Sequence, residues 1–528
     1  MKLKIFINQI GYAQNNLKIA YVKGSSENEV FELCSKDGLV VYSGKLCKSV
    51  SDEISEETTC IADFTSVDKE GVFFIKIQDS KSSCFKIGGD VFNPVYNSLL
   101  RYFYLSRCGQ KIEDKNFEHE ECHNTPALIY GTKIKKSVDG GWHDAGDYGR
   151  YIIAASKAVM DLLLAYRECD GTYNDFNILE EVRFELDWML KMQREDGGVY
   201  HKVSCYHFCS YILPQDEKDE LVISPVSTAA TADFAGCLAF ASTFFELSDK
   251  EYAEKLLNAA IKAQKYIEKN KDAFFKNPPE ITTGGYGDWS IYDEKFFALC
   301  SLYVVTKKSE YLKKAFKLRK KGRNQKTDPE FPWKKYWHFS FGWSCVSGYG
   351  SQLLLENKSL LSDAQIKDLE EEVIENADRI MELIEKSAFG VGLDRIFWGS
   401  NGAVCDEAHV LLLAYDLTKN KKYYYGAFKQ LDYLFGCNPL EICYVTGNGI
   451  KSPERCHHRP SIYLKKIMPG MLAGGPCFPL IDEEAKMYLQ NKPKLSCYID
   501  KDGSYSTNEV AIYWNSTLVH LIAKLKLV

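Results

Sequence analysis

Near its C-terminus the chain reads Cys497-Tyr-Ile-Asp-Lys-Asp-Gly-Ser-Tyr-Ser-Thr-Asn-Glu-Val-Ala-Ile-Tyr-Trp-Asn515, with a glutamate where a polar loop meets an apolar stretch. We predict that Glu509 opens the last helix, with Thr507 or Asn508 as its cap. The apolar and aromatic residues that follow are expected to desolvate this carboxyl group partly, which raises its pKa and suits a general acid. The alternative is a glutamate that only complements the helix dipole.

A second carboxylate-rich stretch is Asp139-Gly-Gly-Trp-His-Asp-Ala-Gly-Asp-Tyr-Gly-Arg150, which has three aspartates within nine residues. Glycines let the backbone turn tightly, so we expect Asp144 and Asp147 to approach one point. Two like charges there would contest ionisation unless one is hydrogen-bonded and the other holds a water molecule. The alternatives are a turn-and-cap cluster or a calcium loop.

Most of the chain has the hydrophobic period of helices. From Tyr96 onward, amphipathic segments recur near 96–107, 148–167, 176–193, 227–246, 250–269, 290–306, 309–321, 342–355, 363–386, 403–417, 421–435 and 508–526. Such helices suggest hairpins closed into a ring rather than a simple bundle. The long loops between them usually carry function, so we expect them to meet at one end of the ring: 139–150, 280–293, 392–402, 436–475 and 498–508.

The N-terminal part has the pattern of β-strands instead. Short alternating runs are separated by polar clusters and cover 19–22, 30–33, 39–42 and 71–77. This spacing predicts a small antiparallel sandwich. Because 528 residues are too many for one ordinary core, we predict two domains, an all-β sandwich over residues 1–90 and an all-α domain over 91–528.

Composition excludes several classes of partner. The net charge is −6 and basic residues form no block, which argues against nucleic acid and against anionic membranes. The most apolar later stretch is interrupted by Asp233, so no membrane partner is expected. The first apolar stretch stops at Asn8, too early for an export signal, and 18 cysteines are scattered without a framework. Both observations favour a cytoplasmic location, unless the N-terminus was trimmed.

Taken together, these stretches resemble glycoside hydrolase family 9 over about residues 5 to 520. The terminal stretch fits the family signature at Tyr498, Asp500, Tyr505, Glu509, Ala511, Asn515 and Ser516, and the Asp-Ala-Gly-Asp loop matches its base-bearing loop. Its substrate-gripping segment and inner loop are similar to Thr446-Gly-Asn-Gly449, His457-His-Arg-Pro-Ser461 and Trp398-Gly-Ser-Asn401. Asn8-Gln-Ile-Gly-Tyr12 resembles the opening of an immunoglobulin-like module that precedes many of its catalytic domains.

The resemblance implies an (α/α)6 barrel and inversion at the anomeric carbon. It makes Asp147 the base, Asp144 its helper and Glu509 the acid, and inversion needs carboxyl groups roughly 6.5–9.5 Å apart. Contacts to the sugar are expected from His457, Arg459, Trp398 and Tyr505. The chain departs from the family pattern at Cys456 and Cys437, which puts subsite detail in doubt rather than the reaction.

Four further residues offer two thiolates and two imidazoles, a set that suits a closed tetrahedral zinc site: Cys108, Cys122, His123 and His143. They also resemble a zinc cluster of family members that carry the immunoglobulin-like module. The nearest rival ligand is His119, and a weaker rival set is His201, Cys205, His207 and Cys209. Calcium is a second metal that the resemblance suggests, without ligands that the sequence identifies.

Three functions follow from these observations. The first is an inverting glycoside hydrolase of the cellulase type that cleaves β-1,4-glycosidic bonds of cello-oligosaccharides or soluble β-glucan. The alternative is an intracellular exo-acting β-glucosidase or exo-β-glucosaminidase on short imported oligosaccharides, which the missing export signal favours. The third is a non-catalytic sugar-binding protein, against which Asp144, Asp147 and Glu509 speak. The expected partner is an oligosaccharide or β-glucan substrate in every case.

Overall fold

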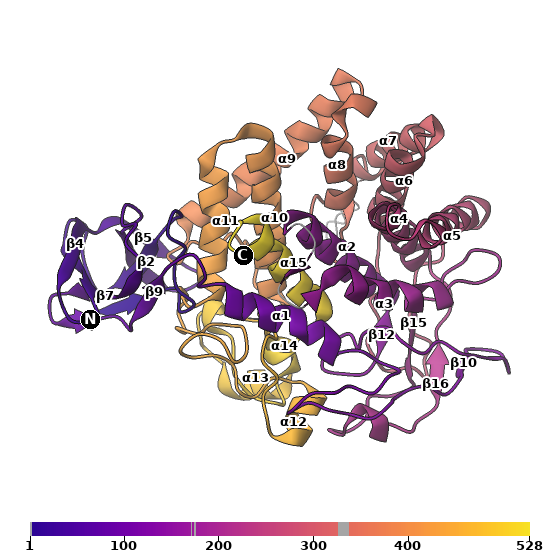
Figure 1. The fold of residues 1–528 in the computed structure, drawn as a ribbon, viewed down its shortest axis with the longest axis horizontal. Helices are drawn as coiled ribbons and strands as arrows, with labels where there is room; N and C mark the ends of the chain where they lie inside the picture. Colours follow the sequence, from indigo (N-terminus) through magenta and orange to yellow (C-terminus); the bar gives the residue numbers. More distant parts are fainter. Residues whose placement is uncertain (1–2, 170–171, 174–175, 326–336) are drawn as a thin grey trace. The chain divides into compact units, whose positions relative to one another are not determined.

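The computed structural model describes residues 3–169, 172–173, 176–325 and 337–528 (Figure 1). The chain forms two compact units, one of Met1–Tyr102 with Ala377–Val528 and one of Phe103–Asn376. Each unit is described by itself. The division into domains at residue 90 stays a prediction.

The first unit begins with the predicted antiparallel sandwich. One sheet has the order β1-β2-β6-β5, and the other has the order β4-β3-β7-β8 with β9 paired to β7. Alternate side chains of β2, β3 and β7 enter a buried core that includes Val22, Phe31, Leu33 and Ile75. The strands are β1 (Lys4–Phe6), β2 (Ile19–Lys23), β3 (Val30–Ser35), β4 (Val40–Lys45), β5 (Cys47–Asp52), β6 (Glu57–Asp63), β7 (Gly71–Ile77), β8 (Ser80–Lys81) and β9 (Phe85–Ile87).

Every helical segment predicted from the sequence is a helix in the structure. These helices are α1 (Asn93–Leu105), α2 (Ile152–Glu168), α3 (Ile178–Lys191), α4 (Thr228–Phe245), α5 (Lys250–Lys269), α6 (Tyr292–Thr306), α7 (Ser309–Arg323), α8 (Ser347–Glu356), α9 (Asp363–Lys386), α10 (Ser400–Thr418), α11 (Lys421–Leu434) and α15 (Ile512–Lys524). Short helices that the sequence did not predict lie in the C-terminal loops: α12 (Arg459–Leu464), α13 (Glu483–Tyr488) and α14 (Tyr505–Asn508).

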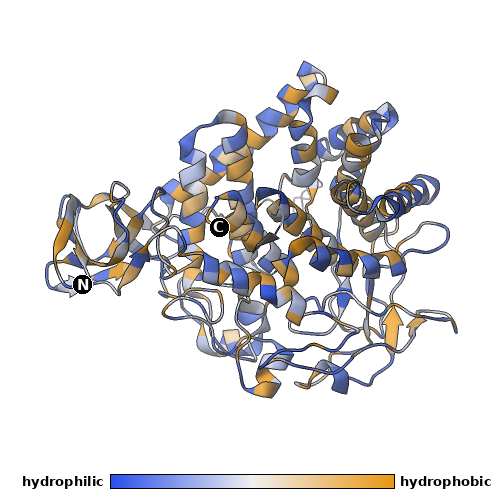
Figure 2. Cartoon of the chain, viewed as in Figure 1, coloured by the Kyte–Doolittle hydropathy of each residue, from blue (hydrophilic) through white to orange (hydrophobic). Residues whose placement is uncertain are grey.

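Helices α4 and α5 illustrate how the pattern sets the packing. Helix α4 is apolar around most of its circumference and almost wholly buried, whereas α5 is amphipathic and buries one face against α4. Figure 2 shows hydrophilic and hydrophobic residues along α5. Both helices begin at side-chain caps, in which Ser227 accepts from the Ala230 N–H and Asp249 from the Tyr252 N–H.

The second unit also contains a small sheet that the sequence did not predict. Its strand order is β11-β10-β16-β15-β12, and β10 and β16 form its parallel pair. The strands are β10 (Ala127–Ile129), β11 (Lys135–Lys136), β12 (Arg150–Tyr151), β15 (Lys202–Cys205) and β16 (Leu221–Ile223), and a separate hairpin joins β13 (Thr172–Tyr173) to β14 (Phe176–Asn177). Because β12 directly follows the aspartate loop, this sheet fixes one end of that loop.

One predicted helix start was wrong. Helix α15 begins at Ile512, and Glu509 lies in extended backbone (φ −69°, ψ 165°) between α14 and α15. The backbone around Glu509 pairs with two neighbouring segments through bridges His457↔Glu509 and Ala473↔Val510, and these hydrogen bonds replace helical ones. Across the described residues, no helix is long and apolar enough to cross a membrane.

Candidate active site and metal centres

The aspartate loop 139–150 is a tight turn built around Gly149. The Asp144 N–H donates to the Gly149 carbonyl at 3.0 Å, and the Gly149 N–H donates to Asp147 Oδ2 at 3.0 Å. A Cβ at Gly149 would lie 2.5 Å from the Tyr151 hydroxyl and 2.8 Å from Asp147 Oδ2. Tyr151 also donates to Asp147 Oδ2 at 3.3 Å. Among the described residues, both of these hydrogen bonds to the Asp147 carboxylate reach Oδ2.

Asp144 is the more buried aspartate of the pair, at 1% exposure. The Tyr286 hydroxyl donates to its Oδ2 at 2.6 Å, while Oδ1 is buried without a hydrogen-bond partner in the described part of the chain. Burial raises the pKa of Asp144 well above its ordinary range, the Tyr286 hydrogen bond lowers it in part, and the charge of Asp147 raises it further. Protonation of Asp144 therefore removes the electrostatic repulsion between two charged carboxylates that the sequence led us to expect.

Lys202 is a neighbour of this pair that the sequence did not identify. Its ammonium group donates to the carbonyl and hydroxyl of Thr283 at 3.2 and 2.9 Å and lies 5.4 Å from the centre of the Tyr151 ring. Burial lowers the pKa of Lys202 to about 7, against the opposing effect of the Asp147 charge. The register of β12 and β15 places Lys202 opposite Tyr151. This strand pairing cannot be predicted from the spacing of residues in the sequence.

Buried carboxylates of α3 anchor the other end of the loop. The Trp142 N–H donates to Glu185 at 2.6 Å, and the Trp142 indole N–H donates to Glu181 at 2.8 Å. Arg107 forms a bidentate pair with the same Glu181, with both N···O distances 2.8 Å. The aspartate loop is therefore held by these buried side chains and by backbone pairing of Trp142 with Arg107.

The four predicted zinc ligands come together in this unit. Their donor atoms all lie within 4.8 Å of one another, and all four side chains are buried: Cys108, Cys122, His123 and His143. The sulfur–sulfur distance is 3.9 Å, the printed sulfur–nitrogen distances are 3.6 and 3.8 Å, and the two nitrogens lie 3.4 Å apart. A tetrahedral zinc ion needs about 3.8, 3.5 and 3.3 Å for these three kinds of pair. The residues present therefore fit a zinc ion.

The surroundings of the cluster also suit a metal. His123 presents its other ring nitrogen to Glu217 at 2.9 Å, the kind of outer contact that orients a metal-binding imidazole. Burial opposes ionisation of Cys108, but the hydrogen bond from Cys122 and nearby positive charges, Arg150 foremost, bring the pKa of its thiol well below the ordinary value. The backbone of His143 leads directly into Asp144, so the cluster tethers the aspartate loop.

The rival ligands take other partners. His119 Nδ1 lies 2.8 Å from the Glu120 carbonyl, and His119 does not belong to the cluster. His201 contacts the Ser227 hydroxyl and the Gly285 carbonyl with its two nitrogens, at 2.8 and 2.9 Å. It also stacks on Phe275 with ring centres 3.6 Å apart, so its set is not gathered around a metal in the described residues.

A group of buried carboxylates in the second unit was not identified from the sequence: Asp233, Asp288, Asp293 and Glu294. Both oxygens of Asp233 and of Glu294 are buried without a hydrogen-bond partner in the described ranges. Burial and mutual repulsion raise their pKa values, to about 7 for Asp288 and about 6 for Asp293. The group is not one whose donor atoms all lie within 4.8 Å, so the calcium ligands stay unassigned.

In the first unit, Glu509 is held by backbone pairing. Its carbonyl accepts from the Gly474 N–H at 2.8 Å, and the Asn508 carbonyl accepts from the His457 N–H at 2.9 Å. Asn508 is fixed in turn, because its side chain accepts from the Tyr498 hydroxyl at 2.6 Å and donates to Asp500 at 3.0 Å. Tyr498 and Asp500 thus fix Asn508, the residue that directly precedes Glu509.

The predicted sugar contacts of this unit also lie together. Trp398 is 41% exposed and its ring centre lies 5.2 Å from that of Tyr505. The His457 ring lies 6.2 Å from Tyr505 on centres and 2.5 Å from the Asp502 carbonyl through Nδ1. Arg459 begins α12 and is buried. These residues form a partly exposed aromatic surface next to hydrogen-bonding groups.

The two cysteines that depart from the family pattern are both buried. Cys456 Sγ lies 3.7 Å from Asn508 Oδ1, and Cys437 Sγ lies 3.7 Å from the Phe6 carbonyl. Burial raises the pKa of both thiols well above the ordinary value, so they act as small apolar groups. Cys456 touches the support of Glu509, and Cys437 packs against the β-sandwich.

Comparison with known proteins identifies the family of the chain. Residues 92–522 match the model of glycosyl hydrolase family 9, and residues 2–82 match the model of the cellulase N-terminal ig-like domain. The chain belongs to glycosyl hydrolase family 9. It is therefore a glycoside hydrolase with an N-terminal immunoglobulin-like β domain and a helical catalytic domain.

Three relatives indicate what kind of hydrolase it resembles. The chain is 35% identical to a cellodextrinase of Butyrivibrio fibrisolvens over 98% of its own length and 99% of the relative's. It superposes with a TM-score of 0.90 at 32% identity on a thermostable endoglucanase of Alicyclobacillus acidocaldarius, over 99% of both chains. A zinc-binding triple mutant of the family 9 endoglucanase J30 has a TM-score of 0.90 at 28% identity, over 97% of this chain and 99% of that one.

Proposed function

We propose that this chain hydrolyses β-1,4-glycosidic bonds of cello-oligosaccharides and soluble β-glucan with inversion at the anomeric carbon. The observation that carries the proposal is the buried aspartate pair, in which Tyr286 binds one carboxyl group and the other keeps an oxygen for a water molecule. The named activities of the cellodextrinase and endoglucanase relatives support the substrate class. We infer in addition the (α/α)6 barrel that family membership implies for the helical domain.

Asp147 is the proposed base. Its Oδ1 accepts a proton from the attacking water while the water oxygen bonds to the anomeric carbon. The contacts from Gly149 and Tyr151 to Oδ2 fix the carboxylate, so that its free oxygen keeps one orientation. Asp144 is the proposed helper, because its buried carboxyl group can hold the same water through the oxygen that has no partner among the described residues.

Glu509 is the proposed acid. It donates its proton to the glycosidic oxygen as the bond to the anomeric carbon breaks, so that the leaving sugar departs as a neutral alcohol. One proton leaves the water and one reaches the leaving group, which balances the reaction. The backbone pairing on both sides of Glu509 supports this role because it fixes the position of the Cα atom.

Trp398 and Tyr505 are the proposed stacking platforms for the sugar rings, since sugar faces are apolar and both aromatic rings are partly exposed. His457 and Arg459 are the proposed donors to sugar hydroxyls. The Asp502 carbonyl lies 2.5 Å from His457 Nδ1, which orients the imidazole ring.

We propose that the thiolate and imidazole cluster holds a structural zinc ion. Two cysteines and two histidines close the coordination sphere, so such an ion has no open position for substrate. The ion would supply a fixed cross-link between the segment of Cys108, that of Cys122 and His123, and the aspartate loop. One structural relative, a triple mutant of the family 9 endoglucanase J30, is zinc-binding.

The reaction is tested with cellohexaose and with a chitosan hexamer at equal concentration, using proton NMR to follow the anomeric signals. We expect turnover of cellohexaose with the α-configured product appearing first. Release of the β-configured product first would contradict inversion, and turnover of the chitosan hexamer alone would contradict the glucan substrate. The relatives do not favour the alternative of an exo-acting β-glucosidase or exo-β-glucosaminidase.

A further inference from the structure

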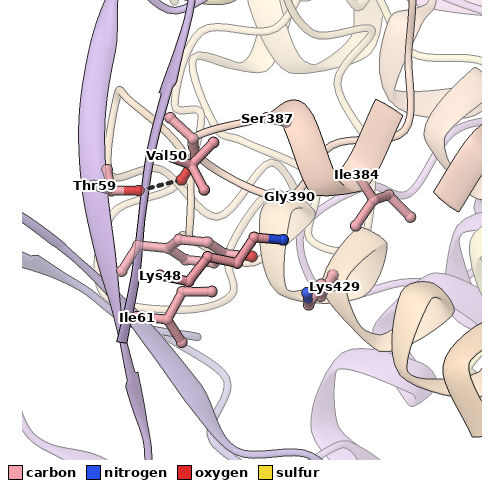
Figure 3. A pocket seen from close by; sticks show the side chains of 10 residues that line it. Lys48, Val50, Thr59, Ile61, Ile384, Ser387, Gly390 and Lys429 are labelled. Carbon is pink, nitrogen blue, oxygen red and sulfur yellow. Dashed lines mark hydrogen bonds between the residues drawn. The ribbon is translucent and has the colours of Figure 1, made fainter. Parts of the chain in front are cut away.

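A small pocket lies in the first unit where the β-sandwich meets two helices of the catalytic domain (Figure 3). Residues of β2, β5 and β6 form one wall, and residues of α9, its following turn and α11 form the other. The enclosed space is about that of one water molecule, and the pocket is partly open to solvent. The proposed catalytic residues do not line it.

Two lysines from opposite walls enter this pocket, Lys48 and Lys429. Figure 3 shows the Lys48 side chain extending from the sheet toward Lys429 of α11. Neither ammonium group forms an ion pair in the described residues, although ion pairs are frequent elsewhere on the surface. Burial and the charge of Lys48 both lower the pKa of Lys429, which shows that the two cations repel each other.

Lys48 reaches the pocket from an unfavourable backbone conformation. Lys48 has a φ of 50°, and the register of β5 against β6 shifts between Cys47 and Val50, so the lysine sits in a bulge. Bulges of this kind re-aim a side chain. Here the bulge directs the side chain of Lys48, an exposed residue, toward Lys429 (Figure 3).

Tyr21 contributes a polar group to the pocket in addition to the two lysines. Its hydroxyl is buried, lines the pocket and has no hydrogen-bond partner in the described ranges. Burial raises the pKa of Tyr21 well above its ordinary value, so the hydroxyl keeps its proton and can donate it. A Cβ at Gly390 would lie 2.3 Å from this hydroxyl and 3.4 Å from Lys429 Cδ, so glycine keeps the space between them open.

We propose that this pocket binds a small inorganic anion of about the size of a water molecule, with chloride as the representative ligand, between Lys48, Lys429 and the Tyr21 hydroxyl. Such an anion satisfies the orphaned hydroxyl and replaces the repulsion of the lysines by two attractions. It bridges the β-sandwich and α11, which already meet nearby through the bonds from Thr59 to the Ala388 carbonyl and from the Ala388 N–H to Asp52.

The neighbouring acidic groups do not take the place of the anion. The groups that act on Lys429 from the elements around it are Lys48, Glu385, Asp432 and Cys47. Glu385 is exposed, and Asp432 Oδ1 is occupied by the Asn8 side chain at 2.8 Å. Burial raises the pKa of Asp432 to about 7, which weakens its charge near neutral pH.

The proposal is tested by isothermal titration of the full chain with sodium chloride at pH 7 and constant ionic strength, with sodium gluconate as the balancing salt. The variants are Lys48→Gln, Lys429→Gln and Tyr21→Phe. Lys45→Gln is the matched control, because Lys45 is an exposed lysine of the same sandwich outside the pocket. Hydrolysis of cellohexaose is measured beside binding and is expected to stay unchanged in all four variants.

We expect chloride to bind the wild type and the Lys45→Gln variant equally and to raise their melting temperatures. Each pocket lysine variant should lose about tenfold or more in affinity, and Tyr21→Phe about threefold. Absence of binding to the wild type at tens of millimolar chloride, or equal binding to the lysine variants and the control, would overturn the proposal. A lysine variant that keeps its circular dichroism spectrum and activity but loses binding supports it without any question of misfolding.

Discussion

The two loops that carry the proposed catalytic carboxylates are held by different kinds of interaction. The aspartate loop rests on buried side chains, because Glu181 and Glu185 bind Trp142 and the cysteine–histidine cluster includes His143. Glu509 rests on backbone pairing to the segments around His457 and Gly474. The base loop thus adds buried side-chain anchors to the backbone pairing of Trp142 with Arg107, whereas the acid position relies mainly on backbone pairing.

The difference follows from what each group must do. A base that holds a water molecule must keep a fixed orientation of its carboxylate oxygens, and hydrogen bonds to one oxygen achieve this. A general acid must bring its proton to the leaving oxygen. We therefore expect its backbone to be fixed while its side chain keeps some rotational freedom. We therefore expect the base loop to be sensitive to packing changes and the acid segment to tolerate them better.

The largest effect is expected for Asp147→Ala, which should lower kcat on every substrate by about 10³-fold or more because the water loses its base. The matched control is Asp139→Asn in the same loop, whose side chain is half exposed and paired with Lys191 at 3.1 Å. Its activity should stay within about threefold of the wild type. Steady-state kinetics on cellohexaose measure both, and equal losses in the two variants would contradict the assignment of the base.

The next effect is expected for Glu509→Gln, and it should depend on the leaving group. Hydrolysis of cello-oligosaccharides should fall by about 10²-fold or more, whereas aryl glycosides with acidic phenols should lose far less because their oxygen needs little protonation. Glu483→Gln serves as the control, since Glu483 is exposed and pairs only with Lys486 in the described part of the chain. Losses that are the same for both classes of substrate would remove Glu509 from the acid role.

The comparison of the two scaffolds is sharpened by one pair of glycine substitutions. Gly149→Ala should lower kcat by about ten- to a hundredfold, because its Cβ meets the Tyr151 hydroxyl and Asp147 Oδ2 below 3.0 Å and displaces the carboxylate. Gly474→Ala on the acid side should cost little, because its Cβ would come no closer than 3.2 Å to Trp514. Kinetics and melting temperatures of both variants decide the point. A larger loss for Gly474→Ala would reverse the comparison.

The fold was largely predictable from the sequence, since a helical period marks α1 to α11 and α15 and an alternating period marks four of the strands. The site was predictable where motifs carry the residues, as for Asp144, Asp147 and the zinc set. Long-range pairing was not predictable. Lys202 reaches the aspartates only through the register of β12 and β15, and Tyr286 only through a loop whose path depends on tertiary packing.

The position of Glu509 shows why local signals can mislead. The polar residues before it and the apolar residues after it have the pattern of a helix start, and the helix indeed begins nearby. The backbone of Glu509 instead pairs with His457 and Gly474, which lie 52 and 35 residues away along the chain. Hydrogen bonds to distant segments outweighed the weaker preference for one more helical turn.

The smallest effect on the reaction, and a clear one on stability, is expected when the zinc set is broken. The protein purified without chelator should contain about one zinc ion per chain, and Cys122→Ser should lose it and lower the melting temperature by about 5 °C or more. Turnover should fall by less than tenfold, because the metal tethers the aspartate loop without touching substrate. Cys205→Ser is the matched control, since Cys205 is a buried thiol near the Asp219 carbonyl outside the cluster and should leave the zinc content unchanged. Zinc absent from the wild type, measured by atomic emission, would show that the cluster works as packed thiols and imidazoles, and the base loop would then depend on α3, on the sheet at β12 and on its backbone pairing with Arg107.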